Sequence, residues 1–294
     1  METVSAGNKS RARIAWGIDR FLFEATVPAS CAAEALGLFG EWQPDPAATE
    51  LAGEWEILEA AAGAWEIRCG EKPAWCRESP QSALAGVESL AIQRIAEETG
   101  PEVGLHAALI ASPHGFVGLV GRCTSGKSTL GCAMAAHRGW RMLGDDSLLV
   151  RLDANGVPTA FSGPRRIAVR TASRELLGEE FWRGMMATRS RMPTEDGYLF
   201  SAEELWGASE TRAGRLSALF LLDRRDSGLG VGEVRALSSG EAALALAPYT
   251  YARERAGFGA ALLSVAPLCG AVRVFELQRG ALDGMISTIS SCLS

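Results

Sequence analysis

The sequence predicts an α/β protein in which a mixed sheet is covered by helices and a smaller β-rich domain precedes it. Three observations support this prediction. Beyond residue 100, apolar strand-like runs alternate with helical segments. A glycine-rich loop joins one of these strands to a helix, whereas short runs with apolar residues at every second position dominate the first 78 residues. We expect a β-rich domain over residues 1–78, a linking helix over 79–100 and the α/β domain over 101–294.

The composition is that of a globular protein and excludes several classes of function. Of 294 residues, 47% are apolar and 22% are charged. The net charge of −6 argues against a nucleic-acid partner, because a phosphate backbone requires a basic surface. No run of 18 apolar residues is present, and the N-terminal segment lacks the apolar centre of a signal peptide. We therefore expect a cytoplasmic protein with no membrane partner, and the sequence leaves open whether it forms homo-oligomers.

The N-terminal domain is predicted from period-two patterns. Ile14, Trp16 and Ile18 alternate with polar or small residues, and EWEILEAAAGAWEIRCG contains two such runs around a small turn. A helical insert is expected near residues 29–40. The linking helix then begins at Pro80 and ends before Gly100.

The second part alternates strands and helices. LHAALIA and FVGLVG are strand-like runs separated by the turn SPHG, and the helix after the loop should end at Arg138 because Gly139 suits the position beyond a helix. WRMLGDD, SLLVRLD, LSALFLLD and AVRVFEL are further predicted strands, and EAALALA is a predicted helix. We expect the strand WRMLGDD to lie directly beside the strand FVGLVG.

The loop from Gly121 to Ser128 matches the phosphate-binding pattern G-x-x-x-x-G-K-[ST], between a strand and a helix. Glycines let the backbone N–H groups point at a phosphate, and the helix N-terminus adds a partial positive charge. Lys127 is expected to reach the β- and γ-phosphates and the Ser128 hydroxyl to bind Mg²⁺. We expect ATP with Mg²⁺ as the cofactors. The predicted binding residues are Gly121, Thr124, Ser125, Gly126, Lys127, Ser128 and Thr129.

Phosphoryl transfer also needs an acidic residue beside the terminal phosphate. Asp145 and Asp146 follow the strand after the loop helix, and two adjacent carboxylates repel each other unless a cation or a proton lies between them. Asp223 ends another apolar run and is an alternative. We favour the Asp145–Asp146 pair, because a charged turn-like stretch follows Asp223.

The stretch from LHAALI through the loop to LGDD resembles the catalytic core of the HPr kinase/phosphorylase family and its shorter relatives. The resemblance is specific over residues 105–150 and looser to about 285, and it implies a fold similar to the ATP-binding part of PEP carboxykinase. It also implies catalytic roles for Lys127, His106 and the two aspartates. Asp146 is favoured as the base that deprotonates the acceptor hydroxyl, with Asp145 and Ser128 supporting the metal.

The acceptor is the open question. Arg165 and Arg166 are candidate substrate residues, because arginines bind phosphates or carboxylates through two hydrogen bonds. The E-I-R-G-x-G stretch of the full-length family members is absent, which argues against HPr as the substrate. The chain is more similar to stand-alone relatives, and these imply a serine kinase acting on a peptide or small protein, first of all a lasso peptide precursor. A kinase for free serine and a nucleotide-binding regulator without kinase activity remain alternatives.

Overall fold

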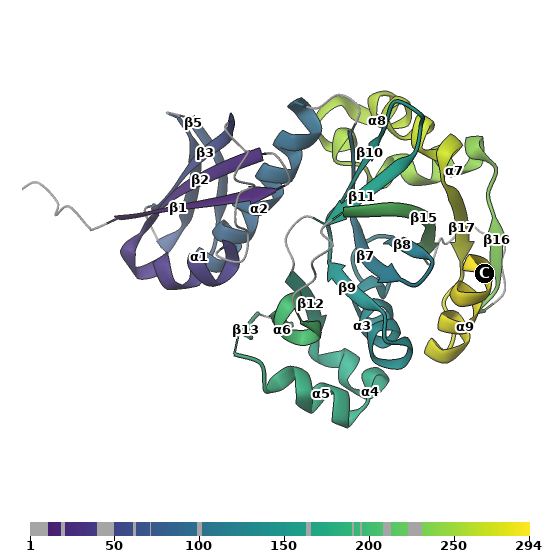
Figure 1. Ribbon diagram of the computed structural model, residues 1–294. Coiled ribbons are helices and arrows are strands. Elements are labelled where there is room, and N and C mark those ends of the chain that lie inside the picture. Colours follow the sequence, from purple (N-terminus) through teal and green to yellow (C-terminus); the bar gives the residue numbers. More distant parts are fainter. Residues whose placement is uncertain are drawn as a thin grey trace, which may run out of the picture. The chain divides into compact units, whose positions relative to one another are not determined.

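The computed structural model of the chain divides into two compact units, Met1–Ile95 and Ala96–Ser294 (Figure 1). The structure describes residues 11–18, 21–39, 50–60, 63–70, 72–98, 102–162, 166–189, 191–194, 196–207, 213–222 and 231–294.

The first unit is a five-stranded sheet in the order β1-β2-β3-β4-β5, with β2 and β3 parallel and the other neighbours antiparallel. Strand β2 continues into η1 and α1, and the helices of this unit accompany the sheet. The elements of the unit are β1 (Arg11–Ile18), β2 (Phe21–Pro28), η1 (Ala29–Cys31), α1 (Ala32–Phe39), β3 (Glu50–Glu59), β4 (Trp65–Cys69), β5 (Lys72–Arg77) and α2 (Pro80–Glu98).

The core of this unit is aromatic. Trp16 stacks on Phe39 with ring centroids 4.3 Å apart, and Phe23 and Trp55 complete the cluster. Helix α2 buries Leu84 and other apolar residues at helical spacing. It is the helix that the sequence assigned to the link, and most of its length belongs to the first unit.

The second unit is built on a nine-stranded mixed sheet, so its α/β class is confirmed. Seven strands follow the order β6-β10-β11-β15-β8-β7-β9, β17 pairs with β15, and β16 pairs with β17. The strands are β6 (Glu102–Leu105), β7 (Ala107–Ser112), β8 (Gly115–Val120), β9 (Arg141–Gly144), β10 (Leu148–Leu152), β11 (Pro158–Ser162), β15 (Ala213–Leu222), β16 (Val234–Ala236) and β17 (Arg273–Leu277).

The position of β9 corrects one expectation. We expected it directly beside β8, but β7 lies between them and pairs antiparallel with both. The strand beside β8 on its other side is β15, which runs parallel to it. Because two antiparallel steps restore the direction, β9 still runs parallel to β8, and both strands end at the same edge of the sheet.

Alternating residues of the central strands face two apolar layers. Ile110 and Leu119 pack with α3 (Lys127–Arg138), α9 (Leu282–Leu293) and a small sheet in the order β12-β14-β13. Leu109 and Val120 pack with α7 (Ser239–Leu246) and α8 (Tyr251–Ala271) on the opposite face (Figure 1). The remaining elements are β12 (Arg166–Arg170), η3 (Thr171–Ser173), α4 (Arg174–Leu177), α5 (Glu179–Met186), β13 (Met192–Pro193), β14 (Gly197–Ser201), α6 (Ala202–Trp206) and η4 (Ala247–Tyr249).

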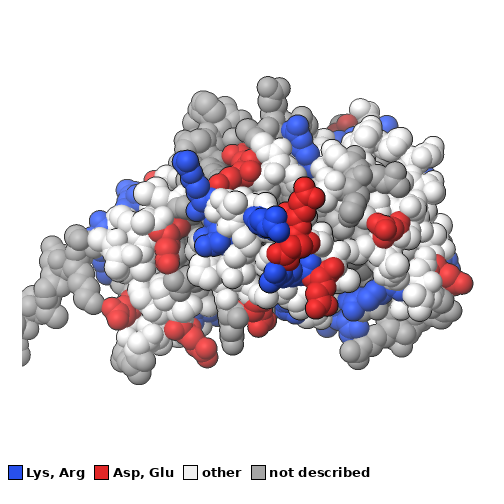
Figure 2. All heavy atoms as spheres, turned by 90° about the horizontal axis from the view of Figure 1, so that it is seen from below, with Lys and Arg blue, Asp and Glu red and all other residues white. Residues whose placement is uncertain are grey.

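Two surface properties bear on partners. In the part of the chain that the structure describes, no helix combines the length and apolar character needed to cross a membrane. On the face drawn in Figure 2, basic and acidic side chains are interspersed, and neither sign forms a large separate patch.

Candidate functional site

The glycine-rich loop curls tightly between β8 and α3. Gly126 precedes the helix with a φ of 95°, and Thr124 has a φ of 71°, a value uncommon for a residue with a side chain. A Cβ at Gly121 would lie 2.5 Å from the Ser125 Oγ, so any larger residue there would have to displace Ser125. No side chain caps α3, which leaves the first N–H groups of this helix facing the loop. This arrangement suits a bound anion such as a phosphate.

Lys127 is buried under this loop. Only 4% of its side chain is exposed, and its Nζ donates to the Gly121 carbonyl at 3.0 Å and to the Arg122 carbonyl at 3.4 Å. The same Nζ lies 3.3 Å from Oδ1 of Asp146. The ammonium group of Lys127 therefore lies between the loop carbonyls and the Asp146 carboxylate.

The two adjacent aspartates differ in environment. Asp145 is buried and accepts a short hydrogen bond from the Ser128 hydroxyl, while its Oδ1 accepts the Asp146 backbone N–H at 3.0 Å. Burial, and next the charge of Asp146, raise the pKa of Asp145 to about 7, although Lys127 and Ser128 oppose the shift. Asp146 is half exposed and has a φ of 59°. Asp145 therefore faces the helix, and Asp146 faces the open site.

His106 reaches the same carboxylate from another element. It lies between β6 and β7, and its Nε2 is 3.2 Å from Oδ1 of Asp146. Its backbone N–H donates to the Tyr249 carbonyl at 2.8 Å, and the Tyr251 hydroxyl donates to the Asp146 carbonyl at 2.7 Å. The junction of η4 and α8 thus holds His106 and Asp146 in place together.

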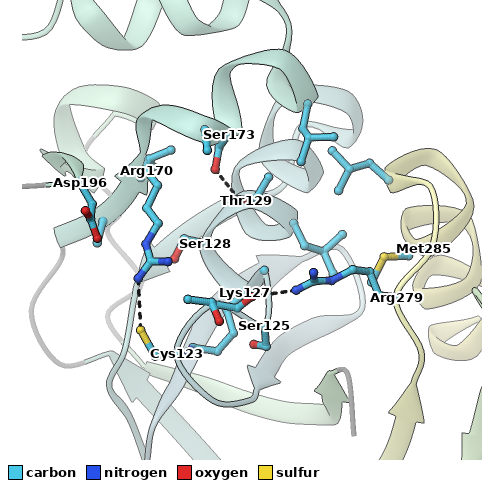
Figure 3. Close-up of a pocket in the computed structure, with 18 of the residues that line it drawn as sticks. Cys123, Ser125, Lys127, Ser128, Thr129, Arg170, Ser173, Asp196, Arg279 and Met285 are labelled. Atoms are coloured by element: carbon cyan, nitrogen blue, oxygen red, sulfur yellow. Dashed lines mark hydrogen bonds between the residues drawn. The ribbon is translucent and has the colours of Figure 1, made fainter. Parts of the chain in front are cut away.

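The loop opens into a cavity of about 590 Å³ (Figure 3). Its walls come from the loop, the start of α3, the end of β12 with η3 and α4, β14 and the segment before it, and the start of α9. A cavity of this size falls in the range of small-molecule sites. The polar side chains on its walls are Cys123, Thr124, Ser125, Lys127, Ser128, Thr129, Asp146, Arg170, Ser173, Thr194, Asp196, Tyr198 and Arg279.

The donor atoms at the start of α3 fit a magnesium ion. The Ser128 hydroxyl and the Asp145 carboxylate converge, and both are the hard oxygen ligands that Mg²⁺ prefers. A cation would also relieve the repulsion between the two aspartates. Within the described residues, no three His, Cys, Asp or Glu side chains are arranged so that they could hold a metal ion by themselves. Mg²⁺ does not need such an arrangement, because it keeps waters and binds phosphate oxygens.

The structure brings together most of the residues that the sequence singled out. Loop residues 121–129, His106 and both aspartates lie around one site, whereas Arg166 is buried and its side chain does not line the cavity. Arg165 and Asp223 lie outside the described residues.

Three residues of the site were not found by sequence reasoning. Arg170 and Arg279 line the cavity, and Tyr251 contacts Asp146. Arg170 follows Arg166 on the same strand, so an alternating strand pattern over 166–170 was the available signal. Tyr251 lies in a polar stretch whose role the sequence left open, and no local pattern indicated Arg279.

Comparisons with known proteins add little to this geometry. No family model matches the sequence, and no curated protein matches it. Among solved structures, the chain is similar to the Hpr(Ser) kinase/phosphatase from Coxiella burnetii. The two are 10% identical, and the match covers 64% of this chain and 90% of that chain, with a TM-score of 0.37. At this score the likeness decides neither the fold nor the activity.

Proposed function

We propose that the chain is a kinase that uses ATP and Mg²⁺ to phosphorylate a serine hydroxyl of a peptide or small protein. One observation carries the proposal: a buried lysine and two carboxylates converge at the N-terminus of the helix that follows the loop. Phosphoryl transfer requires mainly positioning and charge neutralisation, together with a group that accepts the proton of the acceptor. This arrangement contains a group for each task.

The loop and the start of α3 would bind the phosphates of ATP. Lys127 now donates to two loop carbonyls, and β- and γ-phosphate oxygens would be stronger acceptors for the same ammonium group. Ser128 and Asp145 would hold Mg²⁺, which supplies neutralisation and orientation of the phosphates when bound. Thr129 stands where α3 begins, beside the cavity.

Asp146 is placed to act as the base. Lys127 and His106 both contact its Oδ1, and the half-exposed side chain leaves Oδ2 as the second carboxylate oxygen. This second oxygen would accept the proton of the acceptor hydroxyl. The acceptor oxygen then forms a bond to the γ-phosphorus, and the bond from that phosphorus to ADP breaks, with its electron pair leaving on ADP. His106 would keep the carboxylate oriented through its ring N–H.

The acceptor is proposed at two levels. A serine hydroxyl in a peptide or small protein is the broader proposal, and a lasso peptide precursor is the first acceptor to try. A kinase for free serine would use the same groups, as the chemistry at the hydroxyl is identical. A nucleotide-binding regulator would need the loop and Lys127, but it would not need Asp146 to accept a proton.

Phosphate transfer from γ-labelled ATP is the test. The purified chain is incubated with Mg²⁺ and a panel of serine peptides, lasso peptide precursors and free serine, and products are identified by mass spectrometry. We expect a phosphoserine product with the wild-type chain and none with Asp146→Asn, which should still bind ATP. No labelled product from a broad panel would overturn the kinase proposal, and ATP binding without transfer would favour the regulator.

A further inference from the structure

We infer that Arg170 is a catalytic residue of the proposed reaction, and that its guanidinium group contacts the phosphoryl group in transfer. The inference rests on the proposed function. Arg170 is exposed at the end of β12 and lines the cavity that opens from the loop. Figure 3 shows Arg170 and Arg279 reaching the loop from different sides, with Lys127 between them. Positive charge therefore lies on two sides of the glycine-rich loop where it faces the cavity.

The present partner of Arg170 is a weak one. Its guanidinium Nη2 donates to the Cys123 Sγ at 3.4 Å, and sulfur is a poor hydrogen-bond acceptor. Within the described residues, no carboxylate contacts Arg170. A phosphate oxygen at the loop would be a charged acceptor and would form a stronger, charge-assisted hydrogen bond. When ATP binds, Arg170 would therefore exchange its contact with the Cys123 Sγ for one with a phosphate oxygen, and the lost contact costs little free energy.

Neighbouring arginines are committed to other groups. Arg279 donates to the Thr124 carbonyl at 2.7 Å and so supports the unusual backbone of the loop. Arg174, four residues beyond Arg170, forms an exposed ion pair with Glu179 at 2.8 Å. Arg170 differs from both, because its charged group faces the cavity and has only the thiol as a polar partner among the described residues.

Strand β12 holds Arg170 in a fixed position across the site. At the start of the strand, the Arg166 carbonyl accepts the Asp145 backbone N–H at 3.1 Å. Just beyond its end, the Ser173 hydroxyl lies 2.8 Å from the Thr129 hydroxyl of α3. The strand that carries Arg170 is thus hydrogen-bonded to the backbone of Asp145 at one end, and the chain just beyond it contacts the loop helix. Such fixed charges are effective in catalysis, because little reorganisation is needed during the reaction.

Substitution of Arg170 should affect the rate more than binding. We expect Arg170→Ala to lower kcat about 10³-fold, in the range found for arginines that stabilise phosphoryl transfer, while the Kd for ATP changes less than about tenfold. Arg170→Lys should recover part of kcat, because it restores the charge but not the planar fork. Arg174→Ala is the matched control and should retain wild-type kcat.

A second readout does not depend on turnover or on knowing the acceptor. ADP, Mg²⁺ and tetrafluoroaluminate imitate the transferring phosphoryl group, and transition-state analogues bind more tightly than substrates. We expect this mixture to raise the Tm of the wild-type chain well above the Tm with ADP alone. Arg170→Ala and Arg170→Gln should lose that increment, and Arg174→Ala should keep it.

The outcomes separate the inference from the proposed function. If Arg170→Ala retains kcat within about threefold, or retains the full tetrafluoroaluminate increment, the inference is wrong. If the wild-type chain phosphorylates no acceptor but shows an increment that requires Arg170, the kinase proposal fails and the role of Arg170 at the phosphate stands. If the alanine variant does not fold, Arg170→Gln and Arg170→Lys carry the same comparison, because they keep the side-chain stem.

Discussion

The charged residues of the two units are organised in different ways. On the sheet of the first unit, Arg11, Arg13 and Arg68 each pair with a glutamate on β3, β2 and β4 respectively, and the arginine side chains are exposed. In the second unit, Lys127 and Asp145 are buried at one sheet edge and like charges lie side by side. The charges of an exposed ion pair neutralise each other and add little to the stability of the folded chain. Buried charges lower that stability unless a ligand compensates them. The difference indicates that a ligand is expected at the buried charged group of the second unit.

Removal of the buried lysine should have the largest effect. We expect Lys127→Ala to lower kcat/KM at least about 10³-fold and to weaken ATP binding, because the phosphates lose their main cation. Isothermal titration with ATP and the phosphate-transfer assay measure the two effects. Arg68→Ala removes a cation of the first unit and should change neither, and equal losses in both variants would contradict the comparison.

Asp146→Asn should separate binding from chemistry. The amide cannot accept the proton, so kcat should fall about 10²–10⁴-fold. ATP affinity should stay within a few-fold, because the loop and Lys127 are intact. Asp283→Asn, an exposed carboxylate at the start of α9, is the control. A variant that loses ATP binding together with kcat would show that Asp146 serves the nucleotide instead.

Asp145→Asn should change the pH dependence of stability. The folded-state pKa of Asp145 is raised to about 7, above its ordinary value of 3.8, so the folded chain holds the proton more tightly than the unfolded chain. The bound proton therefore adds to the free energy of unfolding. This contribution is complete below about pH 4 and is lost as the pH rises to about 7. Without Mg²⁺ and nucleotide, the wild-type Tm should therefore fall across this window.

The asparagine variant has no proton to lose at this position. At pH 8, in a chelator, its Tm should exceed the wild-type Tm by a few degrees. Its kinase activity should nevertheless be strongly reduced, because the carboxylate that supports Mg²⁺ is gone. Parallel Tm curves for the two proteins between pH 4 and 8 would contradict the raised pKa.

Tyr251→Phe tests the segment that holds the base. Loss of the hydroxyl removes the hydrogen bond to the Asp146 carbonyl, and we expect kcat to fall about tenfold with little change in the KM for ATP. Tyr249→Phe is the matched control, since the Tyr249 contact to His106 uses its backbone carbonyl. Equal rates for both variants would show that Tyr251 does not position Asp146.

The smallest effect is expected in the first unit. Arg13→Ala removes an exposed partner of Glu24, and we expect a Tm change within about 2 °C and unchanged phosphate transfer. Differential scanning calorimetry and the transfer assay measure both. A large loss of activity would mean that the charged sheet face takes part in acceptor binding.

Local patterns predicted much of the fold, and long-range pairing explains the rest. The hairpin of β7 and β8, the end of α3 at Arg138 and the strands on both sides of Asp145 depend on neighbouring residues, and the sequence predicted each of them. The prediction that β9 lies directly beside β8 was wrong, because strand order is set by contacts along the whole sheet. Arg170 and Tyr251 reach the site from elements far from the loop in sequence, so no spacing measured from the loop includes them.

The backbone at Asp146 also limits how this protein can change over evolutionary time. A φ of 59° is tolerated well by Asn, Asp and Gly and poorly by most other residues. A descendant that lost the need for a base could therefore drift to Asn or Gly at this position without losing its fold. Inactive copies of this chain should then be recognisable from one position, as they would retain Lys127 and carry Asn or Gly in place of Asp146.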